Sequence, residues 1–109
     1  MDELIEIASI YTTHPDEHHA RRLCEVLLNE KWIACANLMP AHSMYVWNDQ
    51  RENHQEYITW FKTRWLLAAA VTQRIQSLHN YEVPCICIYK VQVTPSYALW
   101  IERQTREHG

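Results

Sequence analysis

Glycine is almost missing from this chain: one of its 109 residues is glycine, and it is the last, Gly109. Internal turns must therefore use Asn, Asp, Pro or strained positions, which favours a few long elements over many tight hairpins. A glycine-rich phosphate-binding loop is excluded for the same reason. The serines lack the context of a nucleophile elbow, and the carboxylates are scattered along the chain. The sequence therefore does not predict an enzyme.

Charge of one sign is not concentrated anywhere. The net charge is −3 with His neutral, and no block of five like charges occurs, so no surface for nucleic acid or for an anionic membrane is expected. Apolar runs stay far below the length of about 18 residues that crosses a bilayer. Residues 1–6 are acidic and lack the basic region and long apolar core of a signal peptide. These features predict a cytoplasmic protein without a membrane partner.

The cysteines form no C-x-x-C pair. All four, Cys24, Cys35, Cys85 and Cys87, lie in apolar stretches. Buried, reduced thiols account for them better than a disulfide framework does, and reduced thiols agree with the predicted cytoplasmic location.

Apolar residues make up 48% of the chain and follow regular periods along most of its length. A chain of this size forms one domain, residues 1–109, with an ordinary core. Alternation predicts strands, and a period of 3.6 residues predicts amphipathic helices. The expected strands cover residues 4–12, 32–47, 55–64 and 85–93, and the expected helices cover residues 16–30, 65–78 and 96–105.

Four local details refine this expectation. Pro40 should interrupt the second strand, because proline cannot donate to a ladder. The polar residues 48–54 should form the hairpin connection, and Ser96 should cap the last helix. The strand at 85–93 is largely apolar on both faces, which predicts a place inside the sheet.

The element order predicts an α+β, ferredoxin-like βαββαβ antiparallel sheet with an additional C-terminal helix. Two helices cover one face of such a sheet, yet the first and fourth strands carry apolar residues on both faces. Surplus apolar surface indicates a partner, and self-association is the simplest one.

Four short motifs in a fixed order carry a family resemblance. They are Ala-Cys-Ala-Asn at 34–37, Tyr-Val-Trp at 45–47, Lys-Thr at 62–63 and His-Asn-Tyr-Glu-Val-Pro at 79–84. From about residue 7 to residue 100, the chain resembles the CutA divalent-ion tolerance family. The resemblance implies a non-enzymatic homotrimer whose hairpins contact neighbouring subunits. It also implies a role in tolerance of divalent cations, with copper as the metal most often named.

His79 is the candidate metal ligand. In family members with an assigned copper site, the resemblance places a His at this position and a Cys at the end of the first strand, where this chain has Tyr11. Copper or another divalent cation would then bind weakly near a subunit boundary. The alternative for His79 is a helix C-terminal cap. Cys85 could supply a thiolate nearby, although its place at the start of an apolar strand first predicts core.

The other histidines are weaker candidates. His14 and His18 are four residues apart, a spacing that puts two imidazoles on one helix face. No Glu lies between them in the manner of a metalloprotease, and His19 points elsewhere. Solvated side chains in a first helical turn account for them better than a metal site does.

Five further residues are expected at an interface or cleft. Tyr45 and Trp47 project to one strand face, and the resemblance makes them subunit contacts. Lys62, in an apolar strand, would need a partner if buried, for which Glu56 of a neighbouring subunit is a candidate. Tyr11, Lys62, His79 and Tyr81 could line a cleft.

Two other functions fit the same element order. A small-molecule-sensing regulatory trimer resembling the PII signalling proteins would use clefts between subunits, with Lys62 facing an anionic ligand. An RNA-recognition domain shares the order, but the third strand lacks the required aromatic and glycine pattern and the charge is unsuitable.

Overall fold

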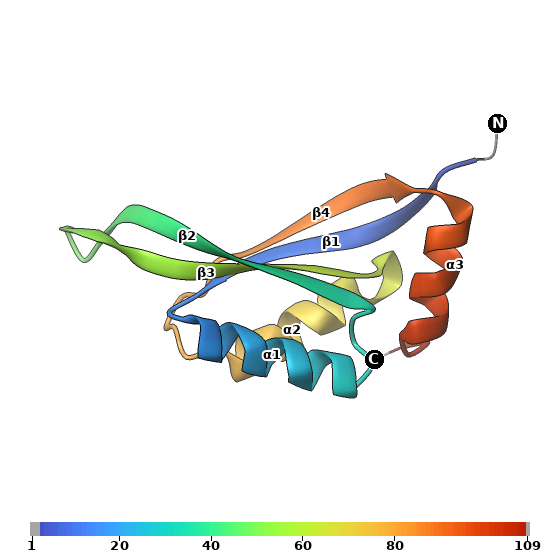
Figure 1. Ribbon diagram of the computed structural model, residues 1–109, viewed down its shortest axis with the longest axis horizontal. Coiled ribbons are helices and arrows are strands. Elements are labelled where there is room, and N and C mark those ends of the chain that lie inside the picture. Colours follow the sequence, from blue (N-terminus) through green and yellow to red (C-terminus); the bar gives the residue numbers. More distant parts are fainter. Residues whose placement is uncertain (1–2, 109) are drawn as a thin grey trace.

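The computed structural model describes residues 3–108, so Met1, Asp2 and Gly109 lie outside the described residues. Four strands and three α-helices follow one another in the expected order (Figure 1). Their bounds are β1 (Ile5–His14), α1 (Glu17–Asn29), β2 (Cys35–Trp47), β3 (Gln50–Arg64), the 3₁₀ turn η1 (Trp65–Leu67), α2 (Ala68–Leu78), β4 (Ile86–Val93) and α3 (Pro95–Gln104).

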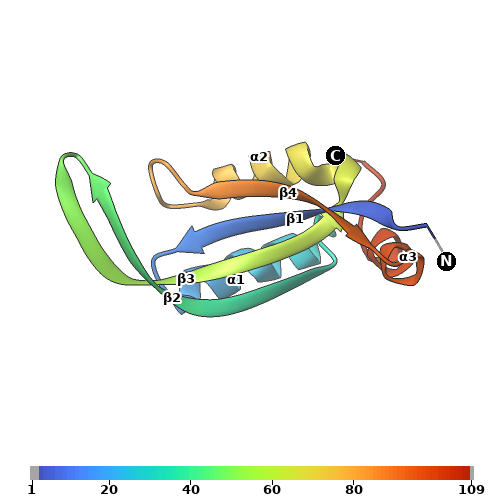
Figure 2. The ribbon, with the colours of Figure 1, turned by 90° about the horizontal axis from the view of Figure 1, so that it is seen from above.

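The strands form one antiparallel sheet in the order β2-β3-β1-β4. Helices α1 and α2 lie along one face of the sheet, called the inner face, and α3 lies at one end of the molecule (Figures 1 and 2). This arrangement confirms the predicted α+β, ferredoxin-like fold with its additional C-terminal helix. The predicted interior place of the fourth strand is wrong, because β4 is an edge strand.

The core lies between the inner face and the two helices. Ile10 and Phe61 are neighbours in the β1–β3 ladder and are fully buried against Leu27, Val71 and Ile75. Side chains at alternate positions point to the opposite, outer face, which carries Tyr11 beside Trp60 on β3 and Cys87 on β4. Since α3 lies only at one end, no helix of residues 3–108 covers most of the outer face (Figures 1 and 2).

Helix α1 follows from its sequence. The Asp16 side chain caps it by accepting from the backbone N–H of His19 at 2.8 Å. Its apolar side chains at helical spacing are buried, namely Ala20, Leu23, Cys24 and Leu27, whereas Leu28 is exposed. At the other end, Lys31 adopts φ 62°. Its N–H donates to Leu28 O and that of Trp32 to Leu27 O, which forms a Schellman ending with lysine in the usual place of glycine.

The β2–β3 hairpin is longer and tighter than predicted. Its loop is not the stretch 48–54 but only Asn48 and Asp49, with φ of 50° and 62°. Positive φ at both residues is typical of a type I′ turn, which Asn and Asp tolerate without glycine. Pro40 does not interrupt β2, because β2 is an edge strand and proline is tolerated there.

Helix α3 begins at Pro95 after the N-cap Thr94, so the expected cap at Ser96 is wrong. Arg64 holds this helix by donating to the Glu102 carbonyl at 2.7 Å and to Thr105 Oγ1 at 3.0 Å. The buried Ile101 packs on Ile7 at the end of the outer face.

The predicted burial of the four cysteines is observed only in part. Cys24 is buried as predicted, but Cys85 is exposed. All four cysteines are free thiols. Among residues 3–108, no helix is long and apolar enough to cross a bilayer.

Candidate metal centre and cleft

Three histidines from three elements meet beside the inner face. His14 is the last residue of β1, His19 lies in the first turns of α1, and His79 is the C-cap of α2. Their candidate ligand nitrogens all lie within 4.8 Å of one another. We call these residues the histidine cluster. The predicted ligand His79 is therefore joined by two residues that the sequence did not point to.

The solvated position predicted for His14 is wrong. His14 is not a solvated residue of a first helical turn but a fully buried strand residue, because β1 runs two residues further than expected. Its neighbour in space is His19, while His18 is exposed. The turn at Pro15 and Asp16 reverses the chain, so a spacing of five residues across the turn brings the two rings together. His79 is about 60 residues further along the chain, so no local sequence pattern indicates that it lies close to His14 or His19.

Hydrogen bonds engage the ring nitrogens of the cluster and, for His79, show which nitrogen carries the proton. His14 Nδ1 lies 2.9 Å from His19 Nδ1, and His14 Nε2 lies 2.8 Å from the hydroxyl of Thr59. The Tyr81 backbone N–H donates to His79 Nδ1 at 3.1 Å, so the proton of His79 is on Nε2, which donates to the Thr13 carbonyl at 2.7 Å. The expected capping position of His79 at the end of α2 is also observed.

Burial keeps the three rings neutral. It lowers the pKa of His14 to about 3, with further lowering from His19 and His79. Burial likewise lowers the pKa of His19, with a contribution from His79, and the pKa of His79. Neutral imidazole is the form that binds metal, so a cation need not first displace a proton from an imidazolium.

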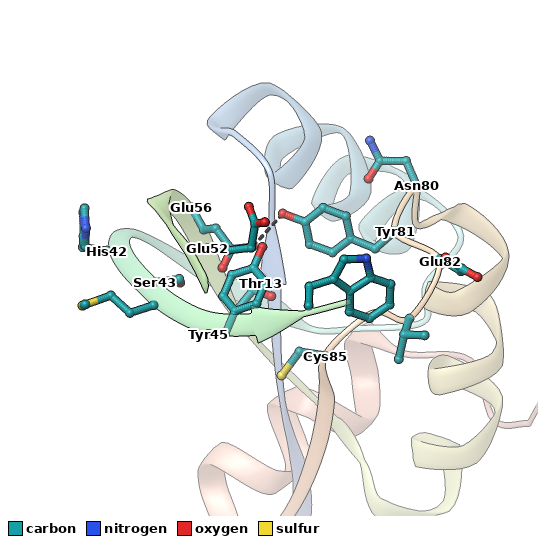
Figure 3. A pocket seen from close by; sticks show the side chains of 13 residues that line it. Thr13, His42, Ser43, Tyr45, Glu52, Glu56, Asn80, Tyr81, Glu82 and Cys85 are labelled. Atoms are coloured by element: carbon teal, nitrogen blue, oxygen red, sulfur yellow. Dashed lines mark hydrogen bonds between the residues drawn. The ribbon is translucent and has the colours of Figure 1, made fainter. Parts of the chain in front are cut away.

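A second feature is a cavity of about 770 Å³ between the β2–β3 hairpin and the turn after α2, called the hairpin cavity (Figure 3). The Tyr81 hydroxyl donates to Glu56 Oε2 at 2.6 Å across its floor. Its lining residues are Thr13, His42, Ser43, Met44, Tyr45, Trp47, Glu52, Glu56, Asn80, Tyr81, Glu82, Val83 and Cys85. Within the described chain its lining includes three carboxylates and neither Lys nor Arg, which favours a cationic occupant.

The predicted cleft residues divide into two groups. Tyr45, Trp47 and Tyr81 line the hairpin cavity. Tyr11 and Lys62 lie elsewhere on the outer face.

Tyr11 packs edge-on against Trp60, with ring centroids 5.1 Å apart. Lys62 donates to Asn37 Oδ1 at 3.3 Å. Within this chain Glu56 accepts a hydrogen bond from Tyr81 and does not pair with Lys62.

These two sites lie on a ferredoxin-like α+β protein with an added C-terminal helix. The family model of the "CutA1 divalent ion tolerance protein" matches residues 8–104. The chain belongs to this family, as its motifs predicted.

Relatives agree along nearly the whole chain. The divalent-cation tolerance protein CutA of Pyrococcus horikoshii is 36% identical over 99 residues, which cover 90% of this chain and 97% of the relative. The crystal structure of CutA1 from Pyrococcus horikoshii matches with a TM-score of 0.89 at 36% identity, covering 92% of this chain and 99% of that one. CutA1 from Ehrlichia chaffeensis matches with a TM-score of 0.87 at 33% identity, covering 92% and 95%.

Proposed function

We propose that this chain serves divalent-cation tolerance by binding the cation directly at the histidine cluster. The observation that carries the proposal is that the candidate ligand nitrogens of three neutral imidazoles lie within 4.8 Å of one another. Imidazole suits Zn²⁺, Ni²⁺ and Cu²⁺, and for a given set of ligands Cu²⁺ binds most tightly. Copper is therefore the expected preference among divalent ions offered at equal concentration.

To form a site, the His14 and His19 nitrogens must move slightly apart, and the more distant ligand nitrogens of the cluster, separated by up to 4.8 Å, must come closer. Two nitrogens on one tetrahedral ion lie about 3.3 Å apart, since each metal–nitrogen bond is about 2.0–2.1 Å. The Nδ1 atoms of His14 and His19, now 2.9 Å apart, need to separate by only a few tenths of an ångström. His79 must release either Thr13 or the Tyr81 N–H, because both of its nitrogens are engaged. That loss of a hydrogen bond predicts modest affinity, and the ion keeps an open position for water or another ligand.

Calorimetric titration with Zn²⁺ and Cu²⁺ tests the proposal. His19→Ala and His79→Ala should each weaken binding by more than the roughly 10- to 100-fold that partners outside the coordination shell contribute. His18→Ala is the matched control, because His18 is the exposed neighbour of His19 outside the cluster. Equal affinities in all four proteins would reject the site.

We also propose that the working form is a homotrimer. Large apolar side chains remain exposed on the hairpin and on the edge strand β4: Met44, Val46, Trp47, Ile88 and Tyr89. Figure 1 shows the hairpin reaching beyond α1 and α2, a shape suited to contact with a neighbouring subunit. Native mass spectrometry should give a trimer that takes up about three ions. A monomer at micromolar concentration would contradict the proposal.

A second candidate function is sensing of a small molecule, favoured by the hairpin cavity. Of the four residues considered for a ligand cleft, only Tyr81 lines it, and Lys62 does not face it. The carboxylates predict an organic cation rather than an anion. A thermal-shift screen with amines and with phosphorylated metabolites separates these classes, because a ligand raises the melting temperature by mass action. Shifts with metals alone would remove this candidate.

A further inference from the structure

Two thiols lie side by side where β4 begins. Cys85 precedes the strand and Cys87 is its second residue, so the two side chains leave the backbone on the same face. Their Sγ atoms are 3.9 Å apart. Both are free, Cys85 is exposed, and Cys87 is half-buried. We call these residues the dithiol pair.

The backbone holds the pair in place. The Thr12 hydroxyl donates to the Cys85 carbonyl at 2.5 Å, which ties the residue before the strand to β1. Cys87 is paired with Tyr11 in the β1–β4 ladder, next to the Thr12 that holds Cys85. The spacing of the two sulfurs therefore does not depend on a mobile loop end. Cys85 also lines the hairpin cavity (Figure 3), so a small ion in that cavity can reach one member of the pair.

The sulfur spacing matches one soft ion. With metal–sulfur bonds of about 2.3 Å, two sulfurs 3.9 Å apart subtend an angle of about 120° at a shared ion. A linear arrangement needs about 4.6 Å, which a small rotation of one side chain supplies. Paired thiolates select soft cations, whereas the histidine cluster offers only nitrogen. The two sites therefore differ in the metals they prefer.

We propose that Cys85 and Cys87 together bind one soft d¹⁰ cation of the Cu(I) type as a bis-thiolate. Each thiol loses its proton to solvent, and each sulfur donates an electron pair to the ion. Two S–H bonds break and two metal–sulfur bonds form, with no change in oxidation state. The proposal goes beyond divalent-cation binding and uses none of the ligands of the histidine cluster.

An anaerobic competition titration of the full chain tests it, with Cu(I) supplied as its complex with bathocuproine disulfonate. The wild-type protein should remove one Cu(I) per chain from the chelator. Cys85→Ser and Cys87→Ser should each weaken binding on the order of 100-fold, since either change destroys a chelate. Cys35→Ser is the matched control, because Cys35 is another half-buried thiol with no cysteine partner; it should change the affinity less than about twofold.

Either of two titration results overturns the proposal: a Cys85→Ser/Cys87→Ser double variant that binds Cu(I) as tightly as the wild type, or an equal loss in Cys35→Ser. Circular dichroism of each variant shows whether it is folded. Copper K-edge absorption of the wild-type complex should show two sulfur neighbours, and a shell of nitrogen alone would overturn the proposal even if a variant failed to fold. His19→Ala should retain full Cu(I) binding, which separates this site from the proposed divalent site.

Discussion

His14 Nδ1 faces His19 Nδ1 at 2.9 Å, so one nitrogen of this pair carries a proton and the other accepts it. Neutral rings fit this contact, since two imidazolium rings would bring two N–H groups and two positive charges together. A divalent cation can use both Nδ1 lone pairs once this proton has moved to the Nε2 atom of its ring, which keeps both imidazoles neutral. The same contact therefore stabilises the fold and prepares the two rings for a metal.

As the pH is lowered, the protein should begin to lose stability at a higher pH than carboxylate titration alone predicts. The pKa of His14 is about 3 in the folded protein and about 6.5 when unfolded, so between these values the unfolded state binds the extra proton. Stability is then complete above about pH 6.5 and falls as the pH drops, by about 1.4 kcal/mol per pH unit from this group alone. The lowered pKa values of His19 and His79 act in the same direction.

Urea unfolding at pH 7, 6 and 5 checks this prediction, because most carboxylates stay ionised over this range. His14→Gln should be less stable at pH 7 but should lose less stability on acidification. A wild-type free energy of unfolding that does not change between pH 7 and pH 5 would show that these rings are not buried as neutral groups.

Lys31→Gly should stabilise the protein. Lys31 has φ 62°, and a left-handed conformation costs a residue with a Cβ atom about 1–2 kcal/mol. Part of this gain is offset because glycine loses more entropy on folding, so we expect an increase of about 0.5–1 kcal/mol in the free energy of unfolding. Lys31→Ala is the matched control, since it removes the same charge but keeps the strain. If both variants shift the urea midpoint equally, the strain is not the cause.

Tyr81→Phe should lower stability without weakening the metal site. The tyrosine hydroxyl is a donor to Glu56, a carboxylate that is only 5% exposed, and leaving it without this donor costs about 1–3 kcal/mol. The Tyr81 contact with His79 comes from the backbone N–H and survives the substitution. Thermal unfolding and Zn²⁺ titration of the same variant measure the two effects. Tyr45→Phe, which removes an exposed hydrogen bond to His54, should cost much less.

Periodicity predicted the elements because burial on one face leaves a pattern within each segment. It did not predict the length of the hairpin, because polar residues on exposed strand positions look like a loop. The exposed position of β4 was missed for a related reason. Ile88 and Tyr89 are apolar at successive positions, and within a single chain both remain exposed at the sheet edge.

The candidate sites, too, could be predicted from the sequence only in part. His79 was found through a local motif, whereas His14 and His19 join it only after β1 and the helices have packed. The spacing of Cys85 and Cys87 was visible in the sequence, but their apolar surroundings suggested core. The exposure of Cys85 and the half-burial of Cys87 depend on where β4 lies in the sheet, which a one-dimensional pattern does not contain.

Zinc K-edge X-ray absorption of the Zn²⁺-loaded wild-type protein tests the central claim most directly, with His18→Ala and His19→Ala measured beside it. The account predicts three imidazole nitrogens at about 2.0 Å in the wild type and in His18→Ala, and two in His19→Ala. A spectrum with oxygen ligands alone, or one unchanged by His19→Ala, would contradict metal binding at the histidine cluster.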